Sequence, residues 1–326
     1  MRTSPTTPMR RLLIGAVAGL SLLSAACGSD DDTADVGDTT TDTTAPQTTV
    51  GAETTVTPAT TAVTGTTVDD DLPDRIVSLS PTATEMIFAI GADDRLVAVD
   101  DQSNFPAGAL ELPNELSGFE PNVEAIASFE PDLVLIGGDF TGLGEQLDEL
   151  DIAWWDGPAA MTLDDSYRQI EELGAATGRA EEADALVDEM QAAIDEIVEA
   201  SPELDEALTF YHELDPTLFS ADSTTFIGEV YSLLGLENIA DGESGAFPQL
   251  NAEFIVSADP DLIFLADTKC CGESAETVAN RPGWDAIAAV RNENVVEMDD
   301  DVASRWGPRI VEYLQDVSDA VAQVAS

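Results

Sequence analysis

Basic residues are scarce in this sequence of 326 residues, and lysine is almost absent. Against 65 Asp and Glu there are only 12 Lys and Arg, Lys269 is the one lysine, and the formal net charge is −53. Such a charge repels phosphate groups at long range, which argues against a nucleic-acid-binding protein. The length corresponds to one large or two modest domains, which is enough to bury a hydrophobic core.

Histidine and the usual catalytic signatures are also scarce. The single histidine, His212, excludes a metal site made of several histidines and leaves a histidine-based triad only one residue to use. In the glycine-rich stretch 136–147, Leu147 stands where a dinucleotide-binding motif has its third glycine. Ala246 likewise replaces the last glycine of a nucleophile elbow. We therefore expect no enzyme activity, no cofactor and no resident metal.

Cysteine occurs three times, at Cys27 and at the adjacent pair Cys270 and Cys271. Two thiols are too few for a closed zinc site. In an exported protein the pair could form a vicinal disulfide or remain as thiols, and the sequence leaves both alternatives open.

The first 26 residues have the pattern of an export signal. Three arginines precede an apolar run at residues 12–26, which is short for a transmembrane helix and suited to a secretory signal. Small residues then lead into Cys27, which resembles a bacterial lipoprotein signal. The expectation is cleavage before Cys27 and acylation of that residue, which would anchor the protein to the outer face of the cell membrane. The alternative is a soluble secreted protein with a chance cysteine.

A polar segment of simple composition follows Cys27. Residues 28–71 contain 16 Thr and 10 acidic residues and almost no bulky apolar side chain. Such a segment cannot bury enough surface to offset its ordering entropy. We predict that residues 27–71 form a lipidated cysteine and a disordered tether.

From residue 72 onwards, short apolar runs alternate with helical segments, as is typical of parallel sheets of the α/β class. Strands are expected at residues 75–80, 95–100, 132–138 and 152–156. Helices are expected at residues 84–90 and 123–129. The predicted division is an N-terminal lobe at 72–160, a helical connector at 161–202 and a C-terminal lobe at 203–326.

One unit of this pattern occurs twice. Residues 121–136 align with residues 250–265 at an offset of 129, with seven identities in sixteen positions. The identities include the pairs Asn122 and Asn251, and Glu124 and Glu253. The repeat predicts two related Rossmann-like lobes with parallel sheets instead of one large sheet.

A helical stretch separates the two copies. Thr162 with Asp165 three residues later predicts a helix start, and Gly174 and Gly178 are expected to interrupt the helical pattern. A long amphipathic helix is expected at residues 180–200 and spans about 31 Å at 1.5 Å per residue. We interpret it as a bridge between the lobes; the alternative is a helix that packs on one lobe.

Three segments of the body carry a family resemblance. Residues 75–106, 122–138 and 303–314 resemble the substrate-binding proteins of ABC importers for ferric siderophores, haem and cobalamin. The resemblance implies two α/β lobes joined by one long helix, a chelate ligand held between them, and an ABC permease and ATPase as partners. It also implies a monomer. The alternative function is an extracellular sensor or adhesion protein that uses the same fold.

The resemblance assigns a docking role to one glutamate of each lobe. Glu124 and Glu253 occupy the positions where family members meet arginines of the permease. The alternative is local, because Asn122 and Asn251 are good helix caps and a nearby glutamate is favourable at the positive end of a helix.

The resemblance and the residue types together suggest the ligand contacts. Cobalamin-type members resemble this chain in an aspartate followed four residues later by an arginine, here Asp301 and Arg305. Aromatic walls suit a large chelate, and the candidates are Phe119, Phe219, Phe247 and Trp306. Each of these aromatic residues could equally belong to the core.

The remaining ligand candidates are polar. Arg305 and Arg309 lie one turn apart and could contact an anionic ligand. We therefore expect them to form a rare positively charged patch on a negatively charged surface. The alternative is that they neutralise local acids. Ser80 and Thr82 follow the first strand and could contact the ligand, or simply cap the helix that follows.

Overall fold

The computed structural model describes residues 72–204 and 206–325. The predicted signal at 1–26, the acylation of Cys27 and the tether at 27–71 lie outside the described residues. The described residues all belong to one unit, residues 61–326. None of the helices in this part of the chain is both long and apolar enough to cross a membrane.

The first sheet is parallel throughout and carries its strands in the order β2-β1-β3-β4. Its strands are β1 (Ile76–Leu79), β2 (Leu96–Val99), β3 (Leu133–Ile136) and β4 (Ala153–Asp156). Helices α1 (Pro81–Ala89), α2 (Val123–Ala127) and α3 (Leu143–Asp148) connect the strands, with short 3₁₀ turns at Asp93–Arg95 and Ala107–Glu111. Strands β1 and β3 are buried along their whole length, and all their residues except Ser78 are apolar, as expected for a parallel sheet covered on both faces.

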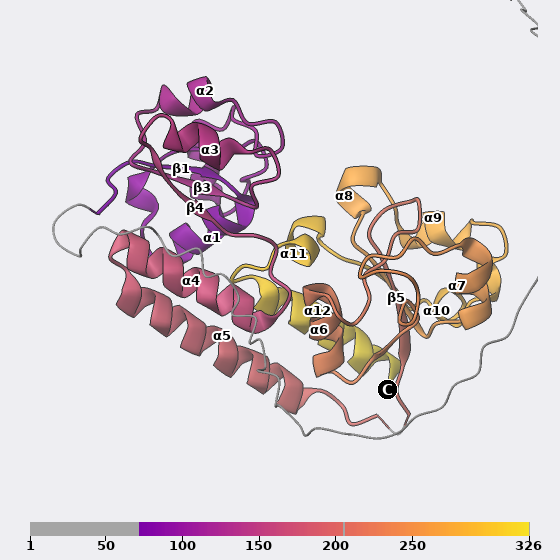
Figure 1. The fold of residues 1–326 in the computed structure, drawn as a ribbon. Coiled ribbons are helices and arrows are strands. Elements are labelled where there is room, and N and C mark those ends of the chain that lie inside the picture. Colours follow the sequence, from indigo (N-terminus) through magenta and orange to yellow (C-terminus); the bar gives the residue numbers. More distant parts are fainter. Residues whose placement is uncertain (1–71, 205, 326) are drawn as a thin grey trace, which may run out of the picture. The chain divides into compact units, whose positions relative to one another are not determined.

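The second sheet repeats this arrangement in the order β6-β5-β7-β8, again with parallel pairing. Its strands are β5 (Thr209–Glu213), β6 (Glu237–Asn238), β7 (Leu262–Leu265) and β8 (Val295–Glu297). Its helices are α6 (Phe226–Leu233), α7 (Ala252–Ala258), α8 (Thr268–Cys271), α9 (Ala275–Ala279) and α10 (Ala288–Arg291), with a 3₁₀ turn at Trp284–Ala286. The two sheets have the same strand order, so the predicted duplication and the α/β fold class are confirmed (Figure 1).

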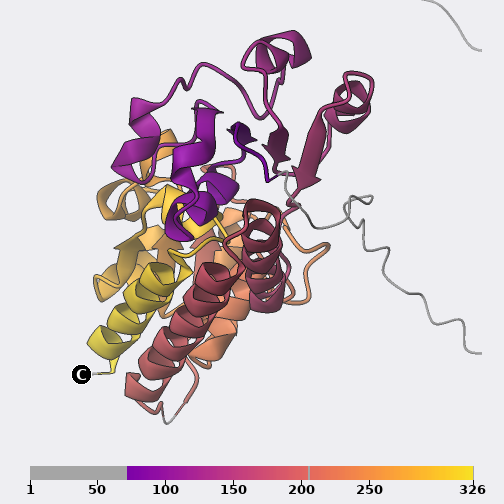
Figure 2. The same ribbon diagram turned by 90° about the vertical axis from the view of Figure 1, so that its left-hand side faces the viewer.

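Four further helices join and flank the sheets. They are α4 (Leu163–Thr177), α5 (Ala180–Ala200), α11 (Asp300–Ser304) and α12 (Ile310–Val324). Helix α5 has the predicted limits and packs against both α4 and α12 (Figure 2). It leads from α4, which follows the first sheet, to β5 of the second, as a bridging helix should.

The prediction that Gly174 interrupts the helical pattern is wrong. Helix α4 continues through Gly174 and ends at Gly178, which adopts a left-handed conformation with φ of 70°. A Cβ atom on Gly174 would lie 2.4 Å from the Cβ of Ala183 in α5. Glycine is therefore present because α4 and α5 approach each other closely, a reason that the sequence of α4 alone does not reveal.

The core explains how the two sheets share one unit. Alternate residues of β1 and β3, such as Ile76 and Leu135, belong to a large buried cluster that also contains Met190 of α5 and Phe264 of β7. The opposite faces of the two sheets pack in two smaller clusters of their own. Burial against α5 and its neighbours thus links the lobes through one continuous hydrophobic core.

Candidate functional site

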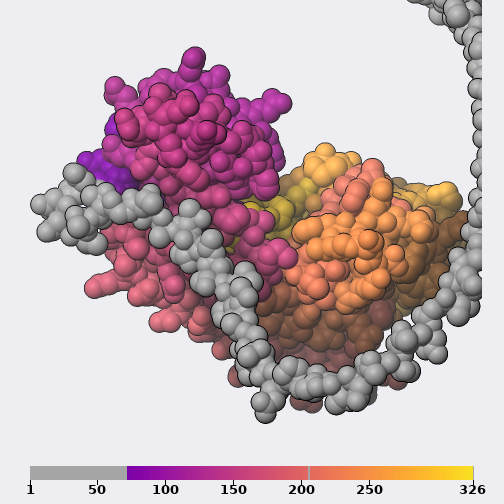
Figure 3. Space-filling view, in the orientation of Figure 1, coloured from indigo at the N-terminus to yellow at the C-terminus, as the bar shows by residue number. Residues whose placement is uncertain are grey.

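In both sheets the strand order reverses between the two central strands, and ligands of such sheets bind outside the carboxyl ends of the strands at that point. In the first sheet this point lies between β1 and β3, and in the second between β5 and β7. Figure 3 shows the surface hollowed between the magenta and orange parts of the body, where yellow residues near the C-terminal end are visible. The loops that leave the carboxyl ends of these strands therefore form the candidate site.

Ser80 and Thr82 lie directly after β1, and both are buried. Ser80 Oγ accepts a hydrogen bond of 3.3 Å from the amide of Ala83 and so caps α1. Thr82 lies close to Gly307: a Cβ atom added to that glycine would be 3.6 Å from Thr82 Cγ2. The structure thus shows a capping role for Ser80, whereas Thr82 lies inside α1; ligand contact by these two residues stays a prediction.

Arg305 and Arg309 share one buried carboxylate on the first lobe. Arg305 Nη1 donates to Oε1 of Glu85 at 2.7 Å, and Arg309 donates to Glu85 Oε2 through Nε at 2.9 Å and to Oε1 through Nη2 at 2.6 Å. Side-chain exposure is 6% for Arg305 and 2% for Glu85. The expectation that these arginines form an exposed positively charged patch is therefore wrong, because both are largely buried and pair with Glu85, which lies more than 200 residues away in the sequence.

The opposite end of Arg305 contacts a second acid. Arg305 Nη2 donates to Asp301 Oδ1 at 2.8 Å, and Asp301 Oδ2 accepts from Lys269 Nζ and from Asn104 Nδ2, both at 3.0 Å. Burial alone would raise the pKa of Asp301, but Lys269 and Arg305 together hold that pKa below its usual value. Asp301 remains 24% exposed, so the carboxylate is anchored and still faces solvent.

Trp306 is half-buried and fixed by hydrogen bonds to α4. Its Nε1 donates to Gln169 Oε1 at 2.8 Å, and its carbonyl oxygen accepts from the hydroxyl of Ser166. Next to it, the Arg309 guanidinium stacks on Phe105 at 4.2 Å. Phe105 and Arg309 line a depression of about 250 Å³, together with Glu85, Phe88, Ala89, Pro106 and Pro308.

Exposed phenylalanines stand on loops that follow strands of both sheets. Phe119 is 79% exposed, Phe219 36% and Phe247 51%, and none of the three is a core residue. The alternative that these three belong to the core is therefore excluded. Phe140, in the loop after β3, is 88% exposed and was not predicted. It lies within the glycine-rich stretch 136–147, which the sequence analysis set aside as a failed nucleotide motif.

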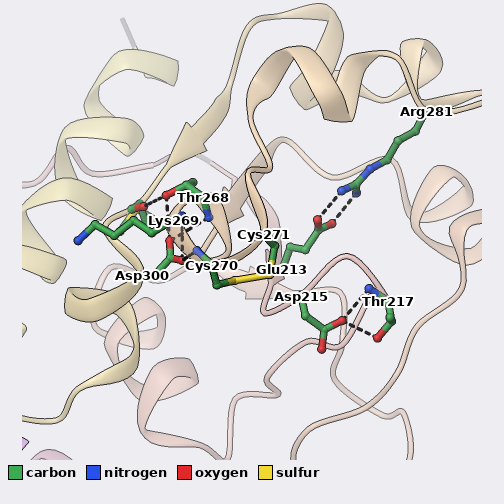
Figure 4. Close-up of a disulfide and its surroundings, with 10 residues drawn as sticks. Glu213, Asp215, Thr217, Thr268, Lys269, Cys270, Cys271, Arg281 and Asp300 are labelled. Atoms are coloured by element: carbon green, nitrogen blue, oxygen red, sulfur yellow. Dashed lines mark hydrogen bonds and ion pairs between the residues drawn. A yellow bond between two sulfur atoms is a disulfide. The ribbon is translucent and has the colours of Figure 1, made fainter. Parts of the chain in front are cut away.

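A buried acidic group lies at the carboxyl ends of β5 and β7 and was also not predicted. Glu213 is fully buried and receives two hydrogen bonds from Arg281, of 2.6 Å and 2.5 Å (Figure 4). Asp267 is fully buried as well, and neither of its carboxyl oxygens has a hydrogen-bond partner among the residues that the structure describes. Burial and the neighbouring charge of Glu213 raise the pKa of Asp267 to about 7.

The adjacent cysteines form a disulfide. Cys270 and Cys271 are bonded to each other within α8, and both are exposed (Figure 4). Of the two alternatives that the sequence left open, the structure therefore has the vicinal disulfide.

His212 lies in the interior of the second sheet. Its Nδ1 is 2.8 Å from the hydroxyl of Tyr231, and the side chain is fully buried in β5. Burial lowers the pKa of His212 to about 3, so the ring is uncharged at neutral pH. Among the described residues, no group of three or more His, Cys, Asp or Glu is arranged to hold a metal ion.

Glu124 and Glu253 occupy equivalent positions in α2 and α7. Asn122 and Asn251 cap these helices, accepting hydrogen bonds of 3.0 Å from Ala125 and 2.9 Å from Phe254. Both glutamates are exposed, and within the described part of the chain neither carboxylate has a hydrogen-bond or ion-pair partner. The capping role of the asparagines is thus shown, and it leaves both carboxylates available to a partner.

Comparisons with known proteins agree with this architecture. A family model of periplasmic binding proteins matches residues 76–302. The ABC transporter substrate-binding lipoprotein YvrC of Bacillus subtilis (strain 168) is 29% identical over 260 residues, which are 76% of this chain and 80% of that protein. The vitamin B12-binding protein of Pectobacterium atrosepticum is 28% identical over 263 residues, which are 78% of this chain and 90% of that protein.

Solved structures give the same result. A possible iron-binding (periplasmic solute-binding) protein from Staphylococcus epidermidis ATCC 12228 superposes with a TM-score of 0.69 at 25% identity. The match covers 77% of this chain and 99% of that one. These relatives are binding proteins and not enzymes, and they favour transport over the sensor or adhesion alternative.

Proposed function

The chain belongs to the periplasmic binding protein family, and on this premise we propose that it captures a metal chelate outside the cell membrane and delivers it to an ABC permease with its ATPase. The chelate class is a ferric siderophore, haem or cobalamin. The relatives include an iron-binding and a vitamin B12-binding protein, which supports this class. The ligand is cargo, so the protein itself needs no cofactor.

One observation gives the main support for this class of ligand. Exposed phenylalanines stand on loops that follow strands in each of the two sheets, Phe119 and Phe140 on the first and Phe219 and Phe247 on the second. Large exposed aromatic side chains are costly to leave in water, and their grouping on such loops suits a ligand with broad apolar faces. The same loops follow the carboxyl ends of the strands, where open α/β sheets bind their ligands.

The polar candidates fall into two roles in this proposal. Asp301 is the partly exposed acid and contacts the ligand directly. Arg305, Arg309 and the half-buried Trp306 form the floor, where their mutual contacts support the ligand. Ser80 and Thr82 hold the start of α1 in position beneath it.

Delivery uses the two exposed glutamates. Glu124 and Glu253 are related by the internal repeat, so they present two similar acidic points to a partner with approximate two-fold symmetry. Acylated Cys27 anchors the monomeric protein to the outer face of the membrane, and residues 28–71 serve as the tether between this anchor and the lobes.

Titration of the purified protein with cyanocobalamin, haemin and a ferric siderophore tests the ligand class. Tryptophan fluorescence is the readout, because Trp306 lies in the floor. We expect at least one probe to quench the fluorescence saturably and Trp306→Phe to reduce the quenching amplitude. Absence of saturable binding by all three probes would contradict the proposal.

A further inference from the structure

The vicinal disulfide lies at a place where a ligand can reach it. Helix α8 begins three residues after β7 ends, at the carboxyl edge of the second sheet. Cys270 and Cys271 are both exposed. Because β7 is one of the two strands between which the strand order reverses, α8 lies at the expected ligand-binding edge of the second lobe.

The turn that carries the disulfide is held by hydrogen bonds to Asp300. Asp300 Oδ2 accepts hydrogen bonds from the amides of Lys269 at 2.9 Å and Cys270 at 2.8 Å. Asp300 Oδ1 accepts from the amide of Thr268 at 2.9 Å and from its hydroxyl at 2.8 Å. One carboxylate therefore satisfies most of the free donors of this short helix and fixes the direction in which the sulfur atoms point (Figure 4).

The internal repeat gives this position a counterpart on the first lobe. At the offset of 129, Cys270 and Cys271 align with Thr141 and Gly142, in the loop that follows β3. That loop carries Phe140, which is 88% exposed. Each lobe thus has an exposed apolar or polarisable group shortly after its third strand. This group is the Phe140 ring on the first lobe and the Cys270–Cys271 disulfide on the second.

The cations near the disulfide are already paired with carboxylates. Lys269 Nζ donates to Asp299 at 2.5 Å and to Asp301 at 3.0 Å. Arg281 is paired with Glu213 and also donates to Glu273 at 2.8 Å. With its cations paired, this surface favours a neutral, polarisable part of a ligand over a carboxylate.

We propose that the Cys270–Cys271 disulfide is a ligand-contact surface that packs against a flat conjugated face, such as a macrocycle or an aromatic ring. Sulfur is polarisable and makes favourable contacts with aromatic rings. Its place in the repeat, next to the position equivalent to Phe140 of the first lobe, suits a ligand that contacts both lobes. This inference rests on the proposed function and adds a specificity-determining element to it.

The test compares the wild-type protein with the double variant Cys270→Ser/Cys271→Ser, using a probe that the wild type binds. The probes are cyanocobalamin and the gallium(III) forms of a porphyrin and a siderophore, which a phosphine does not reduce at the metal. We expect the variant to bind roughly 2- to 10-fold more weakly, the range that a sulfur–aromatic contact supplies. We also expect saturating probe to slow reduction of the wild-type disulfide by a water-soluble phosphine at least about tenfold, because a covered disulfide is inaccessible.

Thermal unfolding of the variant provides the control for its folding, and Arg168→Ala, at an exposed position of α4, provides a control variant with an intact disulfide. A probe that binds wild type and variant equally, with no protection from reduction, would overturn the contact. Weaker binding without protection would also overturn it, since that pattern indicates a structural role. If none of the probes binds the wild type, the proposed function fails and the contact fails with it.

Discussion

Replacement of Glu85 by alanine should destabilise the protein more than any exposed charge substitution. Among the described residues, Glu85 is the one carboxylate that both Arg305 and Arg309 contact, through three hydrogen bonds of 2.6–2.9 Å. Arg309 is 11% exposed and Arg305 6%, so neither guanidinium gains much water when its partner is lost. The variant therefore leaves two positive charges beside each other in a largely buried place.

The expected cost is about 3–5 kcal/mol in the free energy of unfolding, the range measured when one partner of a buried ion pair is removed. Arg305 keeps Asp301 as a partner, which places the cost at the lower end of that range. The double variant Glu85→Ala/Arg309→Ala should cost less than the sum of the two single variants, by roughly 1–3 kcal/mol, because the second substitution removes one of the unpaired charges.

Urea unfolding followed by circular dichroism measures these differences. Arg168→Ala is the matched control, because Arg168 is 55% exposed in its pair with Asp165, and such pairs contribute at most about 1 kcal/mol. If Glu85→Ala costs no more than Arg168→Ala, the buried cluster does not stabilise the contact between the lobes and the reasoning is refuted.

Three further predictions follow from other parts of the molecule. Glu124→Ala/Glu253→Ala should abolish uptake in cells and leave ligand affinity unchanged; sustained uptake would contradict the docking role. Asp267→Asn should raise the melting temperature at pH 8 by more than it does at pH 5. The reason is that the folded-state pKa of about 7 lies above the ordinary value of 3.8, so the wild type loses stability as the pH rises between them. The exposed control Asp184→Asn should change neither value, and equal effects of Asp267→Asn at both pH values would count against the assignment. Gly174→Ala should lower the unfolding free energy by about 1–3 kcal/mol through overpacking against α5, although alanine is the better helix former; a stabilised variant would show that the helices can separate at little cost.

Several elements could be predicted because their determinants are local. Helix α5 has the predicted limits, and the capping box of Thr162 with Asp165 is present at the start of α4. Hydrophobic periodicity and capping act within a few residues, so they can be recognised without knowing the rest of the fold. The repeat was visible for a related reason, because similar local sequences form similar units.

The candidate site could be predicted only in part. The exposed Phe119, Phe219 and Phe247 lie on loops that follow strands of the two sheets, as the aromatic-wall interpretation requires. The exposed state of Arg305 and Arg309 was predicted wrongly, since nothing within one turn of them indicates Glu85. Phe140 was missed because a motif argument dismissed its segment as a whole.

The sequence by itself determined the class of fold, the duplication and the place of the long helix, since these depend on patterns that repeat over 2 to 4 residues or on comparison of one segment with another. The tertiary structure decided which charges neutralise one another and which groups remain exposed. It brought Glu85 to Arg305 across 220 residues, buried His212 and presented the Cys270–Cys271 disulfide on a turn held by Asp300. The physical reason is that burial and ion pairing depend on what the completed chain packs against each side chain, and strand order, not sequence distance, sets those neighbours.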